Sequence, residues 1–255
     1  MRDWFTAERV DGETWRIFER GHWEQPNSWL LIGRGRAALI DSGLGVGDIA
    51  AFVRTLTPLP VTVFLTHAHW DHIGGLAAFP DFRMHAAEVG WLTGKFPLSE
   101  EEVRRQLSLK PCAFPDGFDP SAYRVFRGPP AGTLADGEEA DVGGRKLVAL
   151  HTPGHSPGHL CYFERARGYL WTGDLLYRGQ LDAFYPTTDP QAFFRSLRRL
   201  AGMEKEVSRL LPGHYGEPER GLLRRAADAF ARLDERGLLR RGSGIFGFGD
   251  FSVRL

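Results

Sequence analysis

Three histidines and one aspartate are crowded into a motif of six residues, which reads His67-x-His69-x-Asp71-His72. The motif directly follows an apolar and β-branched run at residues 61–65, which predicts a buried strand. The side chains of His67 and His69 can point to one side of an extended turn, and Asp71 and His72 can face an adjacent point. Imidazole and carboxylate ligands without a thiolate suit Zn²⁺, and also Fe²⁺ or Mn²⁺. The motif therefore predicts a metal site at a strand end rather than a solvated polar loop.

Three further residues could bind metal from the same kind of position. His155, Asp174 and His214 each follow a predicted strand, and each has a glycine directly before it. Glycine permits the tight backbone bends that aim a ligand back across strand ends. Together with the first motif, four strand-end loops offer five histidines and two aspartates. This set is large enough for two metal ions and too large for one tetrahedral ion.

Strands and helices alternate around these loops in a way that predicts a layered α/β sandwich. Further strands are predicted at residues 28–32, 36–40, 82–85, 146–150, 160–163, 169–172 and 209–211, and helices at residues 46–56, 99–107 and 222–233. A short helix is expected to begin near Gly75, and Asp189 before Pro190 predicts another helix start. We expect one domain over residues 1–255, with a helical or irregular insertion at about 88–130 and a C-terminal helix plus Gly/Phe-rich tail at about 218–255.

The composition excludes several classes of protein. Lys plus Arg and Asp plus Glu each total 32 among 255 residues, and the resulting net charge of zero gives no support to nucleic-acid or anionic-membrane binding. Two cysteines exclude a disulfide framework and a cysteine-based zinc ribbon. No run approaches the roughly 18 apolar residues of a membrane span, and the first residues do not resemble a signal peptide. We therefore expect a cytoplasmic protein.

The order of the candidate ligands resembles that of the metallo-β-lactamase fold hydrolases, over roughly residues 10–216. The run at residues 40–43, which includes Asp41, also fits an early strand-end motif of that superfamily. The resemblance implies an α/β fold of the αββα sandwich type. It implies one metal held by His67, His69 and His155, a second held by Asp71, His72 and His214, and Asp174 bridging both. A hydroxide shared by two ions, most often zinc, would attack an acyl carbonyl, and Asp71 would orient it.

The sequence differs from several branches of this superfamily, and these differences narrow the range of expected activities. Zinc β-lactamases lack an acid at the position of Asp174, flavodiiron proteins replace the histidine at His69 by an acid, and ribonuclease Z needs a tRNA-binding arm. The seven ligands resemble the glyoxalase II branch, but only 255 − 214 = 41 residues follow His214, fewer than the helical region that binds glutathione there. Short runs at residues 17–20, 85–88 and 153–156 resemble vertebrate metallo-β-lactamase-domain acyl-coenzyme A thioesterases. This implies a small-molecule acyl thioester as the substrate.

Several other residues have two interpretations. Tyr177, three residues after Asp174, resembles a lactonase tyrosine whose hydroxyl is directed at the substrate, so we predict Asp71 and Tyr177 as catalytic; a tyrosine packed in a loop is the alternative. Asp41 is expected to brace ligands, whereas His22, His85, His151 and His159 are expected to be structural; bracing of the ligands is the alternative for His85. The aromatic residues between 91 and 126 are expected in a core rather than an acyl pocket, and the arginines after residue 219 on a solvated face rather than on coenzyme A phosphates.

The sequence therefore favours one function, and alternatives come from other hydrolases, from oxygenases and from binding proteins. The main one is a dinuclear metal-dependent hydrolase of an acyl thioester, in a monomer or a homodimer. A lactonase and a glutathione-thioester hydrolase are alternatives within hydrolases. A mononuclear iron dioxygenase acting on glutathione persulfide would use His67, His69 or His72, His155 and Asp174 around one iron. A binding protein that lost turnover is disfavoured, because an idle site need not retain all seven ligands.

Overall fold

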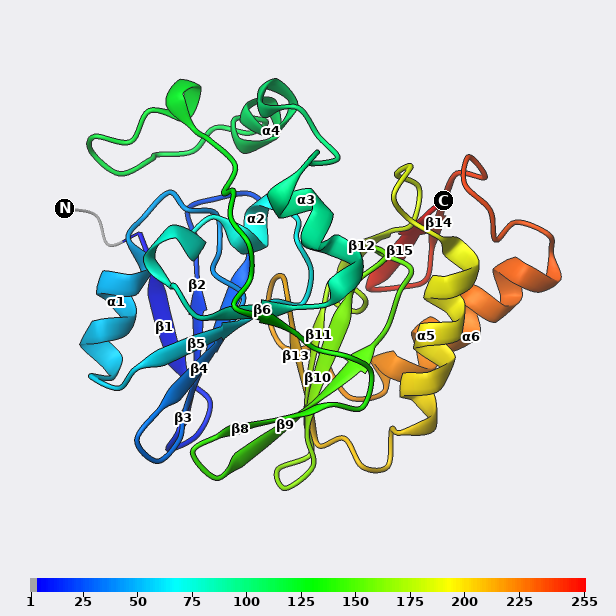
Figure 1. Ribbon diagram of the computed structural model, residues 1–255. Coiled ribbons are helices and arrows are strands. Elements are labelled where there is room, and N and C mark those ends of the chain that lie inside the picture. The colour runs from blue at the N-terminus through cyan, green and yellow to red at the C-terminus, as the bar shows by residue number, and fades with distance from the viewer. Residues whose placement is uncertain (1–3) are drawn as a thin grey trace. The chain divides into compact units, whose positions relative to one another are not determined.

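The computed structural model describes residues 4–255, which fall into two compact units. The first unit comprises the chain up to Met84 together with Glu88–Thr133 and Val142–Gly144, and the second comprises His85–Ala87, Leu134–Asp141 and Arg145–Leu255. The first unit is built around one β-sheet and the second around two, and each unit has its own apolar core (Figure 1). Among residues 4–255, no helix is both long enough and apolar enough to cross a bilayer.

The first unit contains a seven-stranded sheet in the order β1-β2-β3-β4-β5-β6-β7. Its strands are β1 (Thr6–Arg9), β2 (Thr14–Phe18), β3 (Asn27–Ile32), β4 (Ala37–Ile40), β5 (Val61–Phe64), β6 (Phe82–Met84) and β7 (Gly132–Thr133). The strands from β1 to β4 pair antiparallel, and those from β4 to β7 pair parallel. The carboxyl ends of β4 and β5 therefore lie at the same edge of the sheet, and the first metal motif begins there.

The helices of the first unit are short and follow local signals. They are α1 (Ile49–Leu56), α2 (Trp70–Ile73), α3 (Val89–Thr93) and α4 (Glu100–Leu107), with 3₁₀ turns at Leu76–Ala78 and Pro120–Ala122. A further 3₁₀ turn, Ala86–Glu88, begins in the second unit and ends in the first. Asp48 caps α1 by accepting the Ala51 N–H at 2.8 Å, and Ser99 with Glu102 forms a capping box on α4. The short helix expected near Gly75 is the 3₁₀ turn Leu76–Ala78, which has Gly75 as its N-cap, and a further helix, α2, begins earlier, inside the histidine motif.

Aromatic side chains of the expected insertion pack against the core of the first unit. Tyr123 is 6% exposed within that core, and the rings of Phe114 and Phe118 lie 5.1 Å apart. The core interpretation of these residues is confirmed for Tyr123. Trp91 is different, because it is only half-buried and its ring lies parallel to that of His69, with the centroids 5.9 Å apart.

The second unit contains a five-stranded sheet, in the order β13-β11-β10-β9-β8, and a three-stranded sheet, in the order β12-β15-β14. The strands are β8 (Glu139–Val142), β9 (Arg145–His151), β10 (Leu160–Glu164), β11 (Tyr169–Gly173), β12 (Gly179–Asp182), β13 (Arg209–Pro212), β14 (Ile245–Gly247) and β15 (Phe251–Arg254). The Gly/Phe-rich tail, which has no clear sequence period, thus forms two strands, and β15 pairs parallel with β12.

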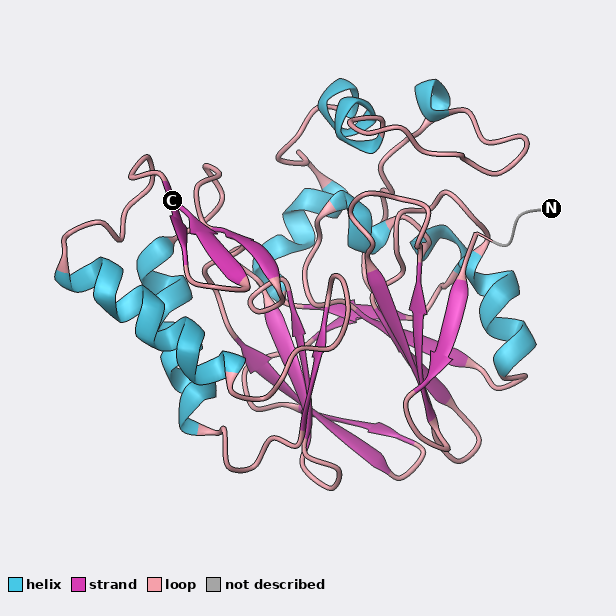
Figure 2. Cartoon of the chain, turned by 180° about the vertical axis from the view of Figure 1, so that it is seen from behind, coloured by secondary structure: helices cyan, strands magenta, loops and turns pink. Residues whose placement is uncertain are grey.

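Two longer helices, α5 (Pro190–Gly202) and α6 (Leu222–Glu235), cover the five-stranded sheet. Figures 1 and 2 both show them side by side along one side of this sheet. Phe193 and Phe230 stack at a centroid distance of 4.9 Å, and both belong to a core with Cys161 and Leu170 of the sheet. As predicted, Asp189 caps α5, since its carboxylate accepts the Ala192 N–H. The helix pair and the sheet thus fix the strand ends that carry the second group of candidate ligands.

Candidate metal centre

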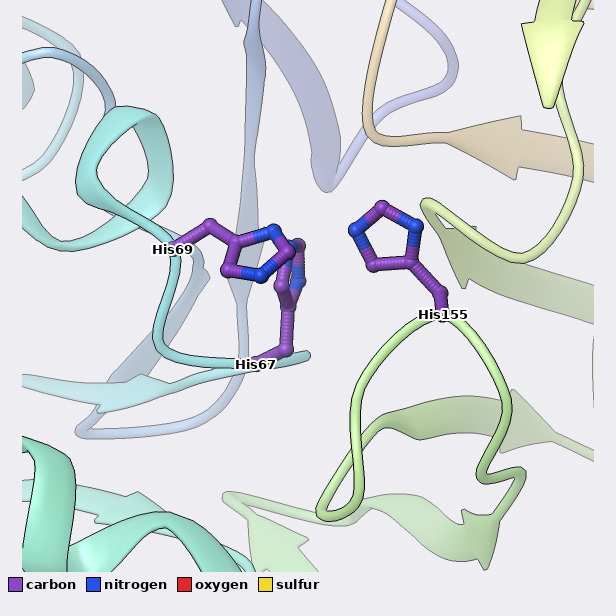
Figure 3. A group of neighbouring side chains, drawn as sticks. All are labelled: His67, His69 and His155. Carbon is purple, nitrogen blue, oxygen red and sulfur yellow. The ribbon is translucent and has the colours of Figure 1, made fainter. Parts of the chain in front are cut away.

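The first group of candidate ligands lies between β5 and the end of α2. His67 is 1% exposed, Asp71 6% and His72 0%, whereas His69 is half-buried at the N-cap of α2. The ring centroid of His67 lies 4.5 Å from that of His69 and 4.4 Å from that of His72. Figure 3 shows the rings of His67 and His69 next to each other. Potential ligand atoms of His67 lie within 4.8 Å of those of His69 and of His72. This group is therefore brought together as the sequence predicts.

Asp41 fixes one of these imidazoles. Its Oδ1 accepts the Thr66 N–H and its Oδ2 accepts the Thr66 hydroxyl, both at 2.7 Å, and Oδ2 lies 3.0 Å from His72 Nδ1. Because an ionised carboxylate only accepts hydrogen bonds, the hydrogen of the His72 ring belongs on Nδ1. Nε2 is then the nitrogen with a lone pair, and it lies 3.5 Å from Asp71 Oδ2. The predicted bracing role of Asp41 is confirmed by these contacts.

Two buried glutamates near this group were not predicted from the sequence. Glu88 is 0% exposed, and its Oε2 accepts the backbone N–H of Ala68, between His67 and His69, at 2.7 Å. Glu19 is 2% exposed and accepts the Leu44 N–H at 2.7 Å. Burial raises the pKa of Glu19 to about 7, while its hydrogen bonds from Leu44 and Trp4 act in the opposite direction. An acid directly after two apolar residues is the signal that could have identified both.

The second group of candidate ligands lies at three strand ends of the second unit. His155 follows β9, Asp174 follows β11 and His214 follows β13, and each is 5% exposed or less. Asp174 Oδ2 lies 3.1 Å from His214 Nε2 and 3.5 Å from His155 Nε2. One carboxylate oxygen is therefore shared by two imidazoles. Figure 3 shows His155 at the tip of its loop.

The glycines before these ligands have the predicted role. Gly154 and Gly173 adopt φ values of 141° and 46°, which side chains rarely allow. A Cβ atom at Gly213 would lie 2.4 Å from Asp174 Oδ1. A side chain at Gly154 or Gly173 would strain the bend that aims His155 or Asp174, and a side chain at Gly213 would clash with Asp174 itself.

The contacts of Tyr177, His85 and the arginines of α6 distinguish between their two interpretations. The Tyr177 hydroxyl donates to the Gln180 carbonyl at 2.6 Å, and its ring lies 5.3 Å from that of His214, an arrangement that the packing alternative predicts. His85 stacks on His151 at 3.9 Å. The arginines of α6 favour the solvated-face interpretation, because Arg225 pairs with Asp250 at 2.7 Å.

The donor chemistry of both groups fits divalent metal ions. Buried imidazole nitrogens and carboxylate oxygens converge within each group, and neither group contains a thiolate. Such mixed nitrogen and oxygen donors suit Zn²⁺, Fe²⁺ and Mn²⁺. Within each group, the ligands would supply opposite charge and lone pairs to a bound cation.

The chain is similar to a known family, to a characterised protein and to solved structures. A model of the metallo-beta-lactamase superfamily matches residues 21–214. The acyl-coenzyme A thioesterase MBLAC2 of Homo sapiens is 30% identical, over 84% of this chain and 82% of its own. A solved metallo-beta-lactamase family protein, TTHA1429 of Thermus thermophilus, is 26% identical with a TM-score of 0.63, covering 84% of this chain and 77% of its own. The solved protein TTHA1623, in a di-iron-bound form, is 28% identical with a TM-score of 0.59, covering 78% of this chain and 92% of its own.

The chain therefore belongs to the metallo-β-lactamase superfamily. This confirms the predicted α/β fold of the αββα type and the predicted class, a metal-dependent hydrolase. It also confirms the resemblance on which the ligand assignment was based.

Proposed function

We propose that this protein is a dinuclear metal-dependent hydrolase that cleaves acyl thioesters of the acyl-coenzyme A kind. The observation that carries the proposal is the 30% identity to an acyl-coenzyme A thioesterase across 84% of the chain, in a sequence that has all seven ligand-type residues. We propose that both units, including the C-terminal tail of the second, form one catalytic domain.

The proposed ligand assignment joins the two groups. One ion would be held by His67, His69 and His155, the other by Asp71, His72 and His214, with Asp174 shared by both. The family model supports this because it spans both groups, and the di-iron form of TTHA1623 shows that a similar protein holds two metal ions. Zinc is the proposed metal, since histidine-rich sets with carboxylates suit it. When bound, two such ions supply a water of lowered pKa and stabilise the charge that develops on the carbonyl oxygen.

The residues of this chain would prepare that chemistry. Asp41 holds the His72 ring with its Nε2 lone pair toward Asp71. Asp71 is the proposed catalytic residue, because its carboxylate can accept a hydrogen from the attacking water and so orient it. The glutamate Glu88 fixes the backbone between His67 and His69.

The leaving group distinguishes thioesters from lactones. A thiol has a pKa of about 8.5, so a thiolate departs without a proton donor, whereas an alkoxide from a lactone needs one. The Tyr177 hydroxyl already uses its hydrogen in a hydrogen bond to the Gln180 carbonyl. This favours a thioester substrate and gives Tyr177 a packing role. A lactonase in which Tyr177 acts on the substrate oxygen is the second candidate.

Elemental analysis and thiol release from a panel of acyl-coenzyme A esters test the proposal on one sample. We expect about two zinc or manganese ions per chain, thiol release by the wild type, and loss of release in Asp174→Ala. Tyr177→Phe is the matched control and should retain thiol release. One iron per chain, with oxygen uptake on glutathione persulfide and no thiol release, would replace the proposal by the dioxygenase. Turnover of lactones or glutathione thioesters alone would favour those alternatives. Cytoplasmic location and a homodimer stay predictions.

A further inference from the structure

His159 lies outside the proposed ligand set but is fully buried in the second unit. It is 0% exposed, although histidine is a polar residue with two ring nitrogens to satisfy. It follows His155 by four positions, and the two rings meet edge to face with centroids 6.1 Å apart. The sequence predicted only a structural role for it, so the partners of its ring need an explanation.

The ring of His159 has one partner that fixes its hydrogen. The backbone N–H of Asp174 donates to His159 Nε2 at 3.1 Å. A backbone N–H can only donate, so Nε2 must carry a lone pair. The neutral ring therefore carries its hydrogen on Nδ1, which lies 3.0 Å from the Thr152 hydroxyl oxygen. Each ring nitrogen is thus matched to a group of the required kind.

These bonds connect two strand-end loops. Thr152 begins the loop that carries His155, and its own N–H donates to the His159 carbonyl at 2.9 Å, which closes that loop. Asp174 lies at the end of the neighbouring strand β11. A single imidazole therefore ties the backbone of Asp174 to the base of the His155 loop.

We propose that His159 is a positioning residue that sets Asp174 against His155 before a metal ion binds. It acts through the backbone of Asp174, so that Oδ2 is held 3.5 Å from His155 and 3.1 Å from His214. The inference rests on the proposed function only in taking these residues as metal ligands. Outer partners of metal ligands typically contribute tenfold to hundredfold in metal affinity, and a site held in advance need not be ordered by the metal.

Zinc affinity of the metal-free protein, measured by competition with a chromophoric chelator, is the first test. His159→Leu removes the acceptor for the Asp174 N–H, and we expect roughly tenfold to hundredfold weaker zinc binding. His159→Gln has a side-chain oxygen that can accept the same N–H, and it should recover much of the affinity. His151→Leu is the matched control, since His151 is half-buried, lies in the same unit and bonds the Pro157 carbonyl through Nε2. This variant should bind zinc like the wild type.

A second measurement does not depend on the variants folding. Nitrogen NMR of the metal-free wild type should show His159 with its hydrogen on Nδ1 and His151 with its hydrogen on Nε2, because a carbonyl partner requires a donor. A hydrogen on His159 Nε2, or a folded His159→Leu with wild-type zinc affinity, would overturn the inference. Absence of thiol release from acyl-coenzyme A in the wild type, with weakened zinc binding in His159→Leu, would overturn the proposed substrate and leave this inference standing.

Discussion

Replacing Asp41 by asparagine should weaken metal binding while the protein stays folded. Asp41 is 1% exposed and has φ of 60°, a left-handed conformation that asparagine tolerates well, so the backbone should not be strained. The carboxylate accepts from the Thr66 N–H, from the Thr66 hydroxyl and from His72 Nδ1. Asparagine has one oxygen and one NH₂ group in the same shape, and therefore cannot accept at both ends.

The magnitude follows from the partners that lose an acceptor. If the amide oxygen stays on the Thr66 N–H, the NH₂ group faces His72 Nδ1, and the ring hydrogen must move to Nε2, the nitrogen proposed to bind metal. If the amide turns over, the NH₂ group opposes the Thr66 N–H instead. Loss of a buried hydrogen bond to a charged group costs about 1.5–3 kcal/mol. We therefore expect Asp41→Asn to unfold at a lower denaturant concentration than the wild type but to remain folded in water. We also expect it to bind zinc roughly tenfold to hundredfold more weakly.

The assay is denaturant unfolding of the metal-free protein together with zinc competition on the same preparations. Asp48→Asn is the matched control, because Asp48 undergoes the same chemical change in the same unit, where it only caps α1. Asparagine is an equally good cap, so both quantities should stay at wild-type values. A folded Asp41→Asn that binds two zinc ions with wild-type affinity would refute the argument that Asp41 sets the tautomer of His72.

Three further predictions concern the same unit. Glu88→Leu leaves the buried Ala68 N–H without its acceptor, so unfolding free energy should fall by about 1–3 kcal/mol and zinc affinity should fall with it, whereas Glu88→Gln retains an acceptor and should lose less in both assays. Trp91→Ala removes a half-buried ring beside His69, and kcat/KM should fall more for long acyl chains than for acetyl-coenzyme A; an equal fall for both would contradict a contact with the chain. Because burial raises the pKa of Glu19 to about 7, above its unfolded value near 4.5, the folded state binds the proton more tightly. The Glu19 contribution to stability should be fully present below about pH 4.5 and lost as pH rises to about 7, a loss that urea unfolding should detect in the wild type and not in Glu19→Gln.

The metal motif could be predicted because its information is local. His67, His69, Asp71 and His72 share one loop, and their spacing alone indicates a common function. His155 and His214 are single residues, but each stands after a glycine at the end of an apolar run, and the φ of 141° at Gly154 gives the physical reason for that pattern. Strand β5 and helix α5 were predicted for similar reasons, from a β-branched run and from an Asp-Pro start.

Other elements lack a local signal. Strands β1 and β2 and the tail strand β15 were not predicted, because segments of four or five residues that mix polar and apolar side chains become strands only when a neighbour supplies the other half of each ladder. β15 depends on β12, about seventy residues earlier, where Gly179 pairs with Phe251. The helix α2 was not predicted, since its N-cap is His69, which makes no capping side-chain bond and so gives no signature.

The bracing residues show the same distinction more sharply. Asp41 reaches Thr66 across 25 positions, and Glu88 reaches Ala68 across 20. Neither partner is chemically unusual, since each offers a backbone N–H that every residue other than proline has. What makes these contacts informative is that the acceptor is a buried carboxylate, which would be costly without such donors. The ligands of a metal site can therefore be identified from spacing. The groups that fix which nitrogen of each imidazole has the lone pair emerge only from the folded chain, and the Nδ1–H tautomer that His72 and His159 share depends on those groups.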